Sequence, residues 1–239
     1  MDNKRKHQRE AGIIRSQMEN KLFIRLTNTE CVLAGGAITS IFSDRPINDF
    51  DIYCRDKKDL DAVVGFFENT DAELEMETDF ARTYKFAGNI YQVIHMEDLM
   101  GDADSIFDSF DFTVCMGSYK FKTDEFYFDD NFFKHLAQKR IVFNNRTPFP
   151  IASLVRTKKY MSRGFTMSNV ETFKLALAIN KLDLSNYKTL RHQLMGMDAS
   201  ILKPMLDSLA ACEDADQEMF LEKVNEYLGN AGWEISAEN

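Results

Sequence analysis

Two aspartates separated by one residue are the part of the sequence best suited to chemistry. Asp49 and Asp51 lie in the run Asp-Phe-Asp-Ile-Tyr, in which acidic and apolar residues alternate. Because side chains alternate in direction along a strand, both carboxylates would point to one side while Phe50 and Ile52 face the core. Two adjacent carboxylates repel each other, but they suit a hard divalent cation that also holds substrate phosphates. An isolated Asp-x-Asp is more often a solvated strand face, so the flanking sequence must decide.

A pair of glycines precedes these aspartates where a helix is expected to begin. The short apolar run 31–34 ends at Gly35 and Gly36, and apolar residues then recur at helical spacing. Glycines let the backbone approach a bulky anion, and the free amides at a helix start favour phosphate. A glycine pair alone indicates only a turn. Strand, glycine turn, helix and Asp-x-Asp strand within residues 31–54 together predict a phosphate-binding turn beside a metal site.

A third aspartate lies further along the chain in an apolar run. Asp111 belongs to Phe-Asp-Phe-Thr-Val-Cys-Met at residues 110–116, which we expect to be a central strand. A carboxylate inside such a run is costly to bury unless it is paired or binds a cation. The sequence therefore predicts Asp111 as the third acid of the site. The alternative is that Asp111 caps a turn at the start of the strand.

The elements around these residues predict an α/β head followed by helices. Apolar residues at helical or alternating spacing define these elements. The expected elements are a helix over 10–28, a helix after 56–59, a hairpin of 82–87 and 90–96 turning at Gly88-Asn89, a short helix and loop over 98–108, a strand or hairpin over 119–128, and helices near 170–181, 188–195, 200–211 and 216–228.

Composition indicates a folded chain rather than a disordered one. Of the 239 residues, 44% are hydrophobic and 12% aromatic. The formal net charge of −9 opposes nonspecific attraction to a polyanion. Basic residues nevertheless gather at 4–9 and 156–163, so local contact with nucleic acid stays open.

The lack of long apolar segments and of paired cysteines bears on cellular location and redox state. No apolar run is long enough to span a bilayer, and the polar start lacks the apolar core of a signal peptide, so we expect a cytoplasmic protein with no membrane partner. The four cysteines form no Cys-x-x-Cys pair. We therefore expect neither disulfides nor zinc.

The order of these motifs resembles a known family. Gly-Gly-Ala-Ile, then Asp-Phe-Asp-Ile, then Asp-Phe-Thr-Val is similar to the head of class II CCA-adding tRNA nucleotidyltransferases and bacterial poly(A) polymerases, members of the DNA polymerase β-like superfamily. Residues 154–160 with Arg163-Gly164-Phe165 resemble the family's neck helix, and the likeness spans about residues 30–175. The chain departs from the family where Thr39-Ser40 replace Arg-Asp and Ser109-Phe110 replace two arginines. The Glu-Asp-x-x-Arg motif that selects the base in that family is missing.

The resemblance implies a nucleotidyltransferase head with a mixed sheet in residues 1–148 and a helical neck with a small C-terminal helical domain in 149–239. It implies metal-dependent transfer of NMP from an NTP such as ATP to an acceptor hydroxyl, most simply an RNA or tRNA 3′ end. Mg²⁺ or Mn²⁺ would be held by Asp49, Asp51 and Asp111. Nucleotide contacts would come from Gly35, Gly36, Thr39, Ser40, Arg156, Lys159 and Arg163.

Two other classes of function and an alternative acceptor stay open. The missing arginines fit a nucleotide-binding regulator that has lost turnover, although all three aspartates are present. The short C-terminal part and the net charge of −9 fit a protein or small-molecule acceptor in place of RNA. A partner-binding protein that works through its acidic surface would leave the Asp-x-Asp pattern unexplained.

Overall fold

A computed structural model describes residues 7–95, 103–184, 186–194 and 196. The helices expected near 200–211 and 216–228 and the basic residues 4–6 lie outside these ranges. No helix in the described ranges is long and apolar enough to cross a membrane.

The N-terminal segment forms two helices, so the prediction of one continuous helix over 10–28 is wrong. α1 spans Gln8–Gln17 and α2 spans Asn20–Leu26. Between them Met18 is extended, and the Glu19 side chain accepts a hydrogen bond from the Leu22 amide at 2.7 Å. This side-chain cap starts a new helix at Asn20. The apolar repeat nevertheless continues through the break, because both helices bury their apolar faces in the same core.

The centre of the molecule is a seven-stranded mixed sheet in the order β3-β4-β5-β2-β1-β6-β7. Only the β2–β5 pair among these strands is parallel. The mixed sheet confirms the expected fold class, but the edge strand β3 had not been predicted from its charged sequence. The strands are β1 Val32–Ala34, β2 Phe50–Tyr53, β3 Glu73–Glu77, β4 Ala81–Phe86, β5 Asn89–Ile94, β6 Gly117–Lys120 and β7 Glu125–Phe128.

The hairpin between β4 and β5 was predicted, with its turn placed one residue too late. The turn residues are Ala87 and Gly88, with φ of 49° and 81°. Positive φ at both central positions suits the right-handed twist of a two-residue hairpin. Asn89 already pairs with Phe86 as the first residue of β5.

The expected strand over residues 110–116 is not formed. Phe112 makes a single bridge to Phe143, and Thr113–Cys115 form a 3-10 helix before β6 begins at Gly117. Val114, Cys115 and Met116 are consecutive and all enter the second hydrophobic core, whereas a strand would direct successive side chains to opposite faces. The alternation of apolar and polar residues over 110–114 favours a strand and does not indicate the 3-10 helix.

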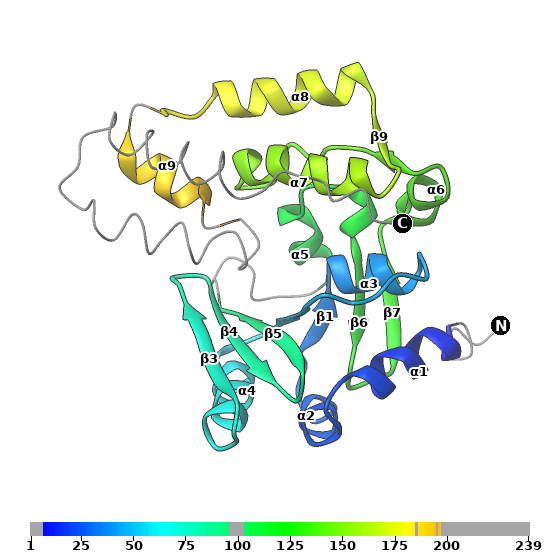
Figure 1. Cartoon of the computed structure of the whole chain (residues 1–239), viewed down its shortest axis with the longest axis vertical. Helices are drawn as coiled ribbons and strands as arrows, with labels where there is room; N and C mark the ends of the chain where they lie inside the picture. Colours follow the sequence, from blue (N-terminus) through cyan, green and yellow to red (C-terminus); the bar gives the residue numbers. More distant parts are fainter. Residues whose placement is uncertain (1–6, 96–102, 185, 195, 197–239) are drawn as a thin grey trace.

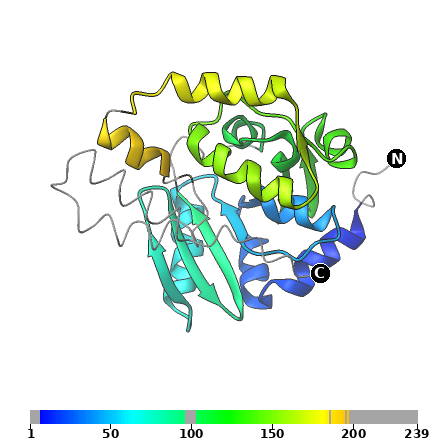
Figure 2. The same cartoon turned by 45° about the horizontal axis from the view of Figure 1, so that its top comes forward.

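The remaining helices lie on two sides of the sheet (Figures 1 and 2). The long pair α7 and α8 lies together beyond α3 and α5, and α2 and α4 lie on the opposite side (Figure 1). The helix near 170–181 and the one near 188–195 are confirmed as α8 and α9. The remaining elements are α3 Gly36–Ile41, α4 Lys57–Glu68, α5 Ala103–Ser109, α6 Phe132–Ala137, β8 Arg140–Ile141, α7 Pro150–Ser162, β9 Thr166–Met167, α8 Asn169–Asn180 and α9 Tyr187–Leu194.

The second hydrophobic core joins the sheet to these helices. Phe112 packs edge-to-face on Tyr160 of α7 with ring centroids 5.6 Å apart. β8, which precedes α7 in the sequence, pairs in parallel with β9, which follows α7. The expected boundary at residue 148 is therefore crossed by a shared core and a strand pair, and the two-domain division stays a prediction.

Candidate active site

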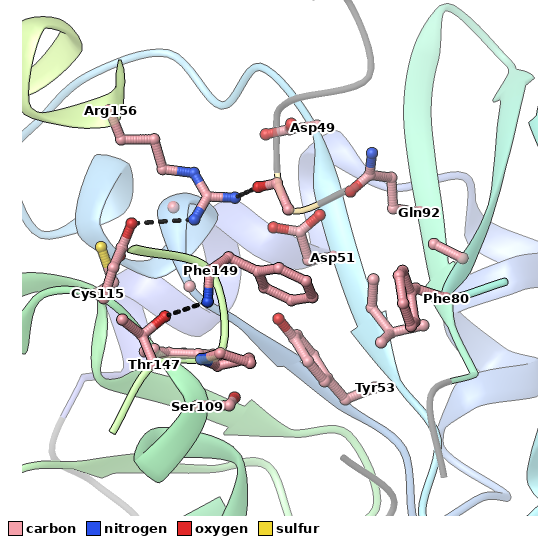
Figure 3. Close-up of a pocket in the computed structure, with 18 of the residues that line it drawn as sticks. Asp49, Asp51, Tyr53, Phe80, Gln92, Ser109, Cys115, Thr147, Phe149 and Arg156 are labelled. Carbon is pink, nitrogen blue, oxygen red and sulfur yellow. Dashed lines mark hydrogen bonds and ion pairs between the residues drawn. The ribbon is translucent and has the colours of Figure 1, made fainter. Parts of the chain in front are cut away.

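A cavity of about 180 Å³ lies between the sheet and the start of α7. It is lined by both glycines of the turn, by Asp49 just before β2 and Asp51 within it, by Asp111, and by two basic residues of α7, Arg156 and Lys159. The structure thus brings together side chains that are up to about 120 positions apart in the sequence. Figure 3 shows Asp49, Asp51 and Arg156 directed toward the same space.

The two carboxylates are positioned by β2. Asp51 pairs with Ala34 of β1 on one side and with Gln92 of β5 on the other. Phe50 is 1% exposed and belongs to the core, as the alternating pattern predicts. Gln92 lies in register with Asp51 and lines the same cavity, so its amide faces the acidic pair (Figure 3).

The glycine turn lies against Asp51. Gly35 has φ 79° and ψ −134°, a conformation that residues with a Cβ rarely adopt. A Cβ at Gly35 would lie 3.6 Å from Asp51 Oδ2, whereas a Cβ at Gly36 would meet nothing within 4 Å. Gly36 therefore opens onto free space at the first turn of α3.

Asp111 forms an ion pair with Arg156 in the cavity wall. Arg156 Nη1 donates to Asp111 Oδ2 at 2.9 Å, and the side chains are 32% and 4% exposed. Arg156 also donates to the carbonyl of Gly196. Among the described residues, no group of three or more His, Cys, Asp or Glu is arranged to hold a metal ion. A metal-binding role for Asp111 therefore stays a prediction.

Three of the predicted nucleotide-binding residues do not line the cavity. Thr39 is buried, and its hydroxyl donates to the Val114 carbonyl at 2.6 Å, which ties α3 to the 3-10 helix. Ser40 is buried on the same short helix. Arg163 lies beyond the end of α7, with its guanidinium 5.8 Å from the centre of the Tyr160 ring. Their contacts with nucleotide stay predictions.

An aromatic wall closes the other side of the cavity and had not been predicted. Tyr53, Phe80, Phe110 and Phe149 all line it, and the Phe80 and Phe149 rings lie 5.7 Å apart (Figure 3). Burial, with a smaller effect of Asp51, raises the pKa of the Tyr53 hydroxyl. Tyr53 follows Asp51 by two positions and could have been found from the strand pattern. Phe80 and Phe149 come from separate connections and left no signal in the sequence.

A thiol also lines the cavity but is not activated. Cys115 Sγ lies 2.9 Å from the Tyr160 hydroxyl. Burial raises the pKa of Cys115 and that of Tyr160 above their ordinary values. Both groups are therefore protonated near neutral pH, and Cys115 lacks the thiolate character of a nucleophile.

This sheet, with its glycine turn and its two aspartates at the start of β2, has the fold of the nucleotidyltransferases. The Thermotoga maritima CCA-adding enzyme complexed with tRNA_CCA superposes with a TM-score of 0.58 at 12% identity, covering 90% of this chain and 55% of that chain. A CCA-adding enzyme in complex with ATP superposes with a TM-score of 0.60 at 15% identity, covering 85% and 53%. At such identities the likeness is one of fold.

The sequence places the chain in a particular family. It belongs to the Gabija anti-defense 2 family, whose model matches residues 6–139. Gabija anti-defense 2 of Bacillus phage SPbetaL7 is 36% identical over 191 residues, which cover 80% of this chain and 48% of the relative. The chain thus spans about half the length of that relative. The fold implied by the motifs is confirmed, but the family differs from the class II CCA-adding enzymes.

Proposed function

We propose that this protein transfers a nucleoside monophosphate from an NTP to an acceptor hydroxyl. The observation that carries the proposal is the pair Asp49 and Asp51 beside the Gly35–Gly36 turn, in a cavity that also contains Arg156 and Lys159. Phosphoryl transfer depends mainly on positioning and on neutralising charge, and this cavity joins carboxylates for a cation with cationic side chains for phosphates.

The residues present fit Mg²⁺ or Mn²⁺. Asp49 and Asp51 would hold the ion, since Mg²⁺ is commonly bound through one or two carboxylates, with water and substrate phosphates completing its ligands. A bound ion would neutralise phosphate charge and favour ionisation of the acceptor hydroxyl. Asp111 holds Arg156 at the cavity wall, so it would orient a cation for the substrate even if it does not ligate metal.

The other lining residues suit the remainder of a nucleotide. Gly36 leaves room for phosphates at the start of α3, and Lys159 adds positive charge. The aromatic wall offers ring faces on which a base stacks, irrespective of its identity. Gln92 can donate and accept hydrogen bonds and would contact a base edge or sugar hydroxyl.

The acceptor we favour is an RNA 3′ end, as in the tRNA complex of the similar fold. The name of the phage relative suggests that such a transfer would serve to counter a Gabija defence system. A protein acceptor within that system is the second candidate, favoured by the acidic surface that the net charge of −9 creates.

Incubation with each α-labelled NTP tests the proposal. The protein is incubated with Mg²⁺ or Mn²⁺, with and without total RNA, and the products are treated with RNase or protease. RNase-sensitive label supports an RNA acceptor, and protease-sensitive label supports a protein acceptor. The double variant Asp49→Asn/Asp51→Asn should produce no label, while Asp61→Asn on the exposed face of α4 should label like the wild type. Absence of label under all conditions, with nucleotide still bound, would instead identify a regulator without turnover.

A further inference from the structure

A second hollow, of about 390 Å³, lies beyond the far ends of α3 and α7. Three cationic residues line it: Arg45 from the loop after α3, Lys139 from the turn between α6 and β8, and Arg163 from the end of α7. Among its lining residues, all of which the structure describes, none is Asp or Glu. In a chain with a net charge of −9, this is a local concentration of positive charge.

The backbone holds these cations together. Arg45 Nη2 donates to the Arg163 carbonyl at 3.1 Å. The Thr166 amide donates to the Lys139 carbonyl at 2.8 Å, and a Cβ at Gly164 would lie 3.5 Å from Lys139 Nζ. Within the described part of the chain, none of the three cations forms an ion pair. Three positive charges are therefore brought near one another with no described carboxylate to balance them, which suits an anion.

Aromatic rings complete the lining. Phe42, Phe133 and Phe165 all contribute to the hollow, and Phe133 is 42% exposed. An exposed ring beside cations is the combination that single-stranded nucleic acid requires, because phosphates contact the cations and bases stack on rings. One part of the Phe133 ring packs on neighbouring rings such as Phe42, and a lone phosphorylated side chain would use the charge but not the part that stays exposed.

A line of basic side chains connects this hollow to the candidate active site. Arg156 and Lys159 are three residues apart on one side of α7, and Arg163, four residues further on, directly follows the end of that helix. Arg156 and Lys159 line the first cavity and Arg163 the second. Seven residues of helix rise about 10 Å, a distance that a few nucleotides of an extended strand can span.

We propose that the second hollow binds the phosphates of a single-stranded RNA whose 3′ end reaches Asp49 and Asp51. This inference rests on the proposed function, because it identifies the acceptor of that reaction. Phosphates would lie between Arg45, Lys139 and Arg163, and an unpaired base would stack on Phe133. The net charge of −9 would limit binding elsewhere, so affinity should depend on these few residues.

Fluorescence anisotropy with a labelled single-stranded oligoribonucleotide of about a dozen nucleotides tests this at several salt concentrations. Each phosphate contact with a single strand contributes a slope of about −0.7 to log K against log salt, which corresponds to about fivefold in affinity at 0.1 M salt. Arg45→Gln and Lys139→Gln should each weaken binding about fivefold and make the slope shallower by about 0.7. Lys85→Gln, the same charge change at an exposed position of β4, should bind like the wild type.

Two results would overturn the inference. One is equal affinity and equal salt slope for Lys139→Gln, Arg45→Gln and Lys85→Gln. The other is displacement of the RNA by an equal concentration of a phosphoserine peptide, which would assign the hollow to a phosphorylated protein. Binding of ATP with Mg²⁺ is measured by calorimetry on the same proteins. If the wild type binds nucleotide while the RNA tests fail, only the RNA path is refuted; if the wild type does not bind nucleotide, the proposed function is refuted instead.

Discussion

At the scale of single residues, Asp49 and Asp51 differ from Asp111 in what surrounds them. The first two lie at β2 beside a glycine turn and an open space, whereas Asp111 is 3% exposed and bonded to Arg156. The first pair is suited to a cation that arrives with substrate. Asp111 instead sets the position of a basic side chain.

Replacement of Asp51 should separate chemistry from stability. Asp51→Asn should lower transfer activity at least about a hundredfold if Asp51 is the metal ligand that we propose. Its thermal midpoint should be unchanged or higher, because one of two neighbouring negative charges is removed in the metal-free protein. Labelling assays and thermal unfolding of the same samples check this, with Asp61→Asn as the control. A variant that unfolds at lower temperature but stays active would contradict the assignment.

Removal of Arg156 should cost stability as well as activity. Arg156→Met leaves the buried Asp111 carboxylate without its partner, and breaking such a pair costs about 3–5 kcal/mol, with the lower end expected here because Arg156 is 32% exposed. Lys159→Met in the same cavity should cost under about 1 kcal/mol. Urea unfolding measures both. The double variant Asp111→Asn/Arg156→Met should recover part of the loss, and equal losses for the two single variants would contradict the role of the pair.

At the scale of elements, the start of α3 determines the shape of the site. Gly35 and Gly36 are adjacent but differ in conformation: only Gly35 has a positive φ. Thr39 Oγ1 contacts the Gly35 carbonyl at 3.2 Å and the Val114 carbonyl at 2.6 Å, so the turn is tied to the 3-10 helix. Thr39, which we expected to contact phosphate, thus stabilises the glycine turn through these hydrogen bonds.

The two glycines should respond differently to alanine. Gly35→Ala should destabilise the protein by about 1–3 kcal/mol, because its backbone conformation is strained for any residue with a Cβ. Gly36→Ala should be neutral or gain up to about 1 kcal/mol from helix propensity, since its Cβ enters open space. Denaturant unfolding compares them. Gly36→Ala should still raise the KM for NTP if phosphates occupy that space, and an unchanged KM would place the phosphates elsewhere.

At the scale of the whole molecule, two hydrophobic cores meet across the sheet. One contains α1, α2 and α4, and the other joins β1 to α5, α7 and α8. The candidate cavity lies where the second core brings α7 against the sheet. Its residues therefore come from both sides of the boundary expected at residue 148.

The ion pairs of Glu30 with Lys120 and Lys122, next to β1, should make the stability of the protein depend on pH. Hydrogen bonds from Lys120, then from Lys122, lower the pKa of Glu30 from 4.5 to about 2. The Glu30 carboxylate therefore binds a proton more readily in the unfolded chain than in the folded protein. Its contribution to the free energy of unfolding is complete above about pH 4.5 and is lost as the pH falls toward 2. Glu30→Gln should show a smaller loss of unfolding free energy than the wild type between pH 7 and pH 3. Parallel losses for the two proteins in urea titrations would refute the contribution of Glu30.

The local part of the site was determined by the sequence itself. A glycine pair ahead of a helix and alternating acids on a strand are patterns of neighbouring residues, and backbone geometry converts them directly into Gly35, Gly36, Asp49 and Asp51 around one space. The order of such motifs also led to the nucleotidyltransferase fold, which the structure confirms. The N-terminal break at Glu19 was missed because the apolar repeat runs through it.

Only the tertiary structure decided how the distant residues are used. Asp111 and Arg156 are 45 positions apart, and Asp111 lies just before the 3-10 helix that replaces the expected strand. The aromatic wall and the assignment of Arg163 to a second hollow likewise depend on how α7 packs on the sheet. Periodicity reports which face of an element is buried, but it carries no information on which other element covers that face.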